Sequence, residues 1–157
     1  MLFDTLDSAL ADIDKSSDYN LDRLIRNYDI DCRYEYLPND IHGYSMPLTR
    51  TMFINNSLEF PDLVKAHELI HCLIDDSAEP LIESSYVSNS KIEGRADHGA
   101  LYLMIKEYIT LTGIEPEDFN VLNFCNQCRV PAKYVFQSAN AAESALDITI
   151  PDSTLYR

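Results

Sequence analysis

The chain has 157 residues, enough for one domain with a core that needs no disulfide bonds or other staples. Hydrophobic residues make up 46% of it and charged residues 24%, a balance that indicates a folded globular protein and excludes an intrinsically disordered one. The formal net charge of −14 argues against direct binding to nucleic acid or to anionic membrane surfaces, because it repels phosphate groups.

The N-terminal sequence MLFDTLDSAL lacks the basic region and the apolar stretch of a secretory signal. No segment reaches the ~18 apolar residues that a membrane-spanning helix needs. Both observations predict a cytoplasmic protein with no membrane partner. In that compartment the four cysteines are expected to be free thiols, namely Cys32, Cys72, Cys125 and Cys128.

The chain is predicted to begin with two short helices that serve packing. Apolar residues at intervals of three and four predict an amphipathic helix from Leu2 to Ile13. A second helix, capped by Ser17 or Asp18, is predicted to run to about Tyr28. Neither helix carries visible chemistry.

Three strands are predicted next, forming a small antiparallel or mixed sheet. Polar residues alternate with a set that would form one buried face, consisting of Ile30, Cys32, Tyr34 and Tyr36. After a turn at PND, residues 38–40, the segments IHGYSMPL and RTMFIN predict two more strands. Residues 51–55 are placed either at the sheet edge, where an extended substrate would add as a strand, or in the sheet interior.

Helices are predicted to dominate the rest of the chain. Residues 57–75 contain no Pro or Gly after Pro61 and are expected to be helical, with Ser57 as a possible N-cap. Residues 76–91 are predicted to form a long loop. A second long helix is expected from about Ile92 to Leu111, ended by Gly113.

Two further helices are predicted within residues 115–128 and 131–144, before an irregular tail of about ten residues. No repeat or linker interrupts the chain. The sequence therefore predicts an α+β fold in a single domain over residues 1–157, with its core at about 20–145.

The segment KAHELIHCLIDD, residues 65–76, places His67, Glu68 and His71 in the spacing H-E-x-x-H. Histidines four apart on a helix lie one turn above each other, so both imidazoles can bind one Zn²⁺ ion. Glu68 can then reach a zinc-bound water as its general base. The alternative is an ordinary helix with two histidines and a surface glutamate.

A third zinc ligand is predicted from the segment KIEGRADHGALYLM at the start of the second long helix. There, Glu93 and Asp97 lie four apart on one helical face. Glu93 can complete a site of two histidines and one carboxylate, and Asp97 can accept the outer N–H of a ligand histidine and fix its tautomer.

The motifs HELIH and EGRAD resemble those of the ImmA/IrrE group of zinc metallopeptidases, which are frequent in bacteriophages and mobile elements. Weaker resemblance to its small phage members extends over about residues 20–135. It implies a zincin-like fold, with His67, His71 and Glu93 as zinc ligands, Glu68 as general base and Asp97 behind a ligand. Ile70 departs from the family, which often has Gly there.

The expected function is that of a zinc metallo-endopeptidase, phage-encoded and active in the host cytosol. The resemblance implies a protein substrate, such as a transcriptional repressor. The alternatives are an antirepressor that binds its partner on the zinc-bound scaffold without cutting it, and a structural phage protein with an empty site. Replacing Glu68 with Gln distinguishes an enzyme from a binder.

Two weaker signals remain. Tyr86 and His98 are candidates for an oxyanion donor, although a surface position is the simpler interpretation of either. Cys125 and Cys128 form a C-x-x-C pair, interpreted as two core-facing cysteines because a second close pair and a βαβ unit are both missing.

Overall fold

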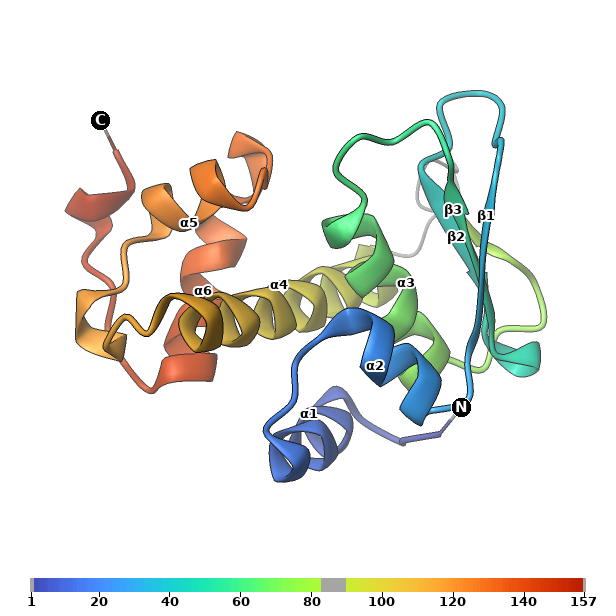
Figure 1. The fold of residues 1–157 in the computed structure, drawn as a ribbon, viewed down its shortest axis with the longest axis horizontal. Coiled ribbons are helices and arrows are strands. Elements are labelled where there is room, and N and C mark those ends of the chain that lie inside the picture. Colours follow the sequence, from blue (N-terminus) through green and yellow to red (C-terminus); the bar gives the residue numbers. More distant parts are fainter. Residues whose placement is uncertain (1, 83–89, 157) are drawn as a thin grey trace.

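The computed structural model describes residues 2–82 and 90–156. These residues form six α-helices and a mixed four-stranded sheet, which confirms the predicted α+β class. Figure 1 shows the sheet at one end, with α3 beside it and α4 leading away to α5 and α6. Among the described residues, no helix is long and apolar enough to span a membrane.

The sheet has the strand order β1-β3-β2-β4, with bounds β1 (Asp31–Glu35), β2 (Gly43–Met46), β3 (Thr51–Asn55) and β4 (Leu81–Ile82). β1 runs parallel to β3, whereas β2 is antiparallel to both β3 and β4. The prediction of three strands was therefore wrong, because the segment predicted as a long loop supplies the fourth. β3 lies inside the sheet, so the option that placed it at the edge was also wrong.

β1 forms where a strand was predicted, and Ile30 just before it is buried as predicted, but the rest of the predicted buried face is wrong. Cys32 is only half-buried, Tyr34 is 50% exposed and Tyr36 is 73% exposed. The cause is position, since β1 is an edge strand and α3 packs on β2 and β3 instead. Alternation in the sequence indicated the strand correctly but could not indicate which strands the helix covers.

The first two helices begin later than predicted. α1 (Leu6–Ser16) starts after Thr5, whose side chain accepts a hydrogen bond from the Ser8 amide in a capping box. α2 (Leu21–Asn27) is capped by Asn20 and not by Ser17 or Asp18. Ser17 instead ends α1 in a left-handed conformation, with φ of 56°.

α3 (Asp62–Ile74) carries the H-E-x-x-H segment, as predicted, but Ser57 does not cap it. The Ser57 hydroxyl donates to the Asn55 side chain, and Pro61 occupies the N-cap position. A residue before proline avoids the helical conformation, which explains why the helix cannot extend back through Phe60.

The long helix α4 (Ser90–Thr112) ends at Gly113, as predicted, and this glycine has a positive φ of 71°. It packs against α3 on one side and α6 (Val135–Leu146) on the other, and α5 (Val121–Gln127) packs against α6. The tail is not wholly irregular, because residues 152–155 form a 3₁₀ turn with Leu155 buried. The buried apolar residues, from Ala9 to Leu155, form one core cluster.

Candidate metal centre

α3 is buried on every side between the sheet and α4, and all residues from Lys65 to Ile74 are buried. His71 is 0% exposed, Glu68 2% and His67 3%. Polar side chains in such an environment need specific partners, because burial removes their contacts with water. The sequence interpretation of the motif as a surface feature of an ordinary helix does not fit this burial.

Each histidine is held through its Nδ1 atom by an aspartate. His67 Nδ1 lies 2.8 Å from an Asp97 oxygen, and His71 Nδ1 lies 2.8 Å from an Asp75 oxygen. A carboxylate accepts a hydrogen bond from a protonated Nδ1. Both rings therefore carry a proton on Nδ1, the nitrogen that faces away from the other ring. Both Nε2 atoms are thereby directed to a common point.

The two Nε2 atoms lie 3.1 Å apart, and Glu93 reaches both of them. Its carboxylate oxygens are 2.8 Å from His67 Nε2 and 3.3 Å from His71 Nε2. In a tetrahedral zinc site with bonds of 2.0–2.2 Å, neighbouring ligand atoms lie about 3.3 Å apart. These three donors therefore fit the spacing that such an ion requires.

The protonation of the site reflects these contacts. Burial opposes charge on His71, but hydrogen bonds with Asp75 and Glu93 outweigh it and raise the pKa of His71 to about 9. Burial likewise acts against charge on Glu93, but hydrogen bonds from His67 and His71 lower the pKa of Glu93 to about 2. Without an ion, a proton on His71 therefore compensates the Glu93 carboxylate.

Glu68 differs from the other carboxylates of the site. Burial raises the pKa of Glu68 to about 7, although the nearby histidines oppose the rise. Its Oε1 atom is buried with no hydrogen-bond partner among the described residues. The backbone of β2 approaches closely here, since a Cβ atom added to Gly43 would lie 3.5 Å from Glu68 Cγ.

Asp75 and Arg95 belong to the site although sequence reasoning missed them. Asp75 lies one turn beyond His71, and its second oxygen accepts from Arg95 Nη2 at 2.9 Å. The spacing H-x-x-x-D was a usable signal, because residues four apart on a helix are neighbours. Arg95 sits on the same stretch of α4 as Glu93 and Asp97.

The remaining candidates lie elsewhere. His98 is half-buried, and its pKa is lowered by burial and raised less by Asp7 of α1, which places it on the α1 side of α4. Tyr86 lies outside the described residues. All four cysteines are free thiols, as predicted. The Cys125 thiol donates to Ser138, and burial raises the pKa of both Cys125 and Cys128.

Comparison with known protein families, with curated proteins and with solved structures found no match for the chain. The fold and site thus define the protein as an α+β protein with a buried group of His67, Glu68 and His71 that can hold a metal ion. The potential ligand atoms of these three residues lie within 4.8 Å of one another.

Proposed function

We propose that the protein is a zinc-dependent metallo-endopeptidase with a zincin-like arrangement. The observation that carries the proposal is the pair of Nε2 atoms 3.1 Å apart in a buried site, each ring held by an aspartate on its other nitrogen. Nitrogen and carboxylate donors without a thiolate match catalytic zinc sites of the two-histidine, one-glutamate type.

In this proposal His67, His71 and Glu93 would hold the ion, which would activate a water molecule. When bound, zinc supplies a Lewis acid for the scissile carbonyl and lowers the pKa of the water. Asp97 and Asp75 keep the two imidazoles in the binding tautomer, and Arg95 keeps Asp75 in place.

In this proposal Glu68 transfers a proton from the attacking water to the leaving amine. Its Oε1 takes a proton from the water as the water oxygen bonds to the carbonyl carbon. It then gives that proton to the amine nitrogen as the C–N bond breaks, so the carboxylate ends as it began. In the metal-free site, burial raises the pKa of Glu68 to about 7, so this carboxylate can exchange a proton near neutral pH.

A peptide bond in a regulatory protein is the proposed substrate. The resemblance of HELIH and EGRAD to phage and mobile-element peptidases supports a transcriptional repressor as that protein, and a bacterial cytosol as the place of action. The net charge of −14 supports contact with the repressor itself and not with its DNA.

Zinc content tests the metal centre. We expect about one zinc per chain in protein purified without added metal, and far less in the Glu93→Gln variant. Glu117→Gln, which removes an exposed carboxylate of the same kind, should keep the parent content. Circular dichroism establishes that each variant is folded. If the folded parent takes up no zinc even when zinc is offered, the proposal is wrong.

The Glu68→Gln variant tests the reaction. We expect it to keep its zinc and to lose peptide hydrolysis, because Gln cannot accept the proton of the water. The measurement is a comparison of new protein N-termini in a bacterial lysate treated with the parent or with the variant. New N-termini that form equally with both proteins would contradict the role of Glu68. Partner binding by both proteins without any new N-termini would identify a non-cleaving antirepressor.

A further inference from the structure

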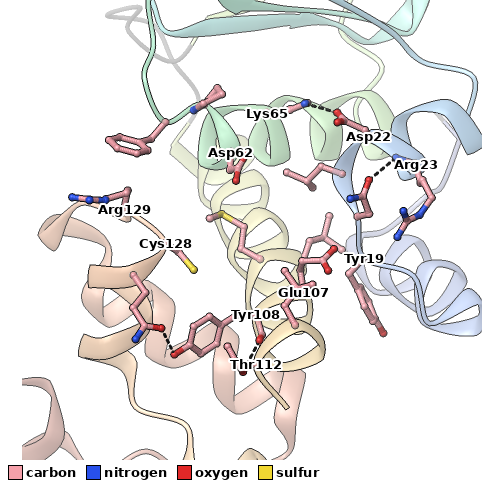
Figure 2. A pocket seen from close by; sticks show the side chains of 18 of the residues that line it. Tyr19, Asp22, Arg23, Asp62, Lys65, Glu107, Tyr108, Thr112, Cys128 and Arg129 are labelled. Atoms are coloured by element: carbon pink, nitrogen blue, oxygen red, sulfur yellow. Dashed lines mark hydrogen bonds and ion pairs between the residues drawn. The ribbon is translucent and has the colours of Figure 1, made fainter. Parts of the chain in front are cut away.

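A second feature lies away from the metal centre, in a cleft of about 1070 Å³. It is bounded by the start of α2, the segment leading into α3, the later part of α4 and the end of α5 (Figure 2). None of the residues that form the metal centre lines it. Glu107 of the cleft follows Asp97 by ten residues on α4, which corresponds to about 15 Å along the helix.

The cleft has an apolar floor and an apolar rim. Leu103, Met104 and Tyr108 of α4 are buried beneath it. At the rim, Phe60 is 51% exposed and Leu111 is 77% exposed. Large exposed apolar side chains beside a hollow are typical of surfaces that bind a partner.

The cations that line the cleft already have partners. Lys65 forms an ion pair with Asp22, and Arg23 pairs with Asp18. The Arg129 guanidinium lies over the Phe60 ring, 4.8 Å from its centroid. Among the described residues, carboxylates therefore compensate Lys65 and Arg23, whereas Arg129 keeps its positive charge at the Phe60 end of the cleft.

The carboxylates that line the cleft differ in this respect. Among the described residues, Glu59, Asp62 and Glu107 have no hydrogen bond or ion pair to another side chain, although the charge of Arg23 acts on Glu107 at longer range. Glu107 Oε2 is also buried, with no hydrogen-bond partner in that part of the chain. A buried carboxylate oxygen without a partner is costly, so a cationic group placed beside it would be stabilised.

The size of the cleft fits an extended ligand. Small-molecule sites occupy about 300–1,000 Å³. This cleft already exceeds that range, and a second hollow of about 520 Å³ adjoins it, with Phe60 and Arg129 lining both. Two hollows that share lining residues offer room for more than one residue of a polypeptide.

We propose that the cleft binds a basic, partly apolar polypeptide segment, with an arginine or lysine side chain directed to Glu107 and Asp62. Its apolar neighbours would lie on Tyr108, Leu111 and Phe60. The net charge of −14 also favours encounter with a basic partner. This binding requires neither zinc nor peptide hydrolysis. The binding proposal can therefore be tested independently of the proposed function.

Binding of a defined peptide to the full-length Glu68→Gln protein tests the proposal without cleavage of the probe. The probe is a fluorescein-labelled peptide with two arginines flanked by leucines, and its binding is followed by anisotropy. We expect binding to weaken about tenfold when both arginines are replaced by citrulline, which keeps their shape and removes their charge.

A pair of double variants, made in the same background, separates the cleft from the general acidic surface. Asp62→Asn with Glu107→Gln should weaken binding of the arginine peptide about tenfold. Glu117→Gln with Asp118→Asn makes the same change of net charge at exposed positions outside the cleft, and should leave the dissociation constant unchanged. Equal weakening by both pairs would overturn the proposal, because it would show diffuse attraction only.

Cysteine alkylation locates the peptide without any further variant. Cys128 is half-buried and lines the cleft, whereas Cys32 is half-buried on β1 and lies outside it. Figure 2 shows the Cys128 sulfur projecting into the cleft. Saturating peptide should slow alkylation of Cys128 about fivefold or more and leave Cys32 unchanged. Unchanged alkylation of Cys128 at saturation would place the peptide elsewhere and overturn the proposal.

Discussion

His67 and His71 are held in a site with more carboxylates than cations. In the described part of the chain, Glu68, Glu93, Asp75 and Asp97 surround the two rings, and Arg95 forms an ion pair with Asp75. Buried negative charge without compensation destabilises a fold. A divalent cation at the point where the two Nε2 atoms meet would compensate this charge. The site therefore favours a bound ion.

Zinc binding is expected to release a proton from His71. Because the pKa of His71 is raised to about 9, its ring is protonated at pH 7.5, and a ligand nitrogen must be neutral. Zinc affinity should therefore rise with pH up to about 9. Calorimetry in two buffers with different ionisation enthalpies measures the released protons. Buffer-independent heats at pH 7.5 would contradict the prediction, and less proton release is expected at pH 10.

Asp75 is expected to act on zinc through His71. Asp75→Asn keeps the size of the side chain but weakens its hold on His71 Nδ1, and should reduce zinc affinity by about 10- to 100-fold. Competition with a chelator measures the affinity. Asp76→Asn, a change at the exposed neighbouring residue, serves as the matched control. Equal affinities of the two variants would remove Asp75 from the metal centre.

At the scale of elements, the close packing of β2 on α3 sets the position of Glu68. A Cβ atom at Gly43 would lie 2.7 Å from Val64 Cγ1 and 2.9 Å from the Phe53 carbonyl oxygen. Only a glycine at this position lets the strand lie so near the helix. The distance between the sheet and Glu68 therefore depends on the absence of a Cβ atom at Gly43.

Two alanine substitutions should consequently have opposite effects on stability. Gly43→Ala forces β2 away from α3 and should lower the free energy of unfolding by about 1–3 kcal/mol. Gly94→Ala places a Cβ in open space on α4 and should raise it by about 0.5–1 kcal/mol. Denaturant unfolding measures both values. A Gly43→Ala protein as stable as the parent would show that β2 shifts freely.

Sequence periodicity predicted the helices and strands better than it predicted which of them pack together. The four-residue spacings of His67 with His71 and of Glu93 with Asp97 survive in the fold, because a helix fixes what lies one turn away. The strand order was not predictable, because the parallel pairing of β1 with β3 passes over β2. β4 has two residues, too few for any alternation.

The cleft could not be predicted for a related reason. Its walls come from four segments between Tyr19 and Arg129, which tertiary packing alone brings together. Asp75 had a visible spacing from His71 but no motif to draw attention to it. The candidate metal ligands, in contrast, lie within two helices. The helical repeat alone determines which side chains of one helix share a face.

At the scale of the whole molecule, Asp14 ties the N-terminal helix to the long helix through Tyr102 and also holds Tyr19. Asp14 of α1 accepts hydrogen bonds from Tyr19 at 2.5 Å and from Tyr102 of α4 at 2.7 Å. Burial and the Asp14 carboxylate raise the pKa of both tyrosines above the ordinary value of 10.0. The neutral phenols are therefore favoured in the folded protein.

This pair should make the protein lose stability at alkaline pH. The stabilisation is complete below pH 10, where the tyrosines are neutral in both states, and declines above it because only the unfolded chain readily loses these protons. Tyr19→Phe and Tyr102→Phe should each reduce the decline, measured by denaturant unfolding between pH 9 and 11. A change at the exposed Tyr156 should leave it intact.

One stripe of α4 connects the metal centre with the cleft. Glu93 and Asp97 lie on the same helical face as Met104, Tyr108 and Leu111, because their spacings follow the helical repeat. If both proposals hold, a polypeptide anchored beside Glu107 would have its neighbouring residues held near the proposed zinc site at high effective concentration. Glu107 follows the proposed zinc ligand Glu93 by 14 residues, which corresponds to about 21 Å along the helix and to about six extended residues. The helix α4 would then set the number of substrate residues between the basic side chain bound in the cleft and the peptide bond that is cut.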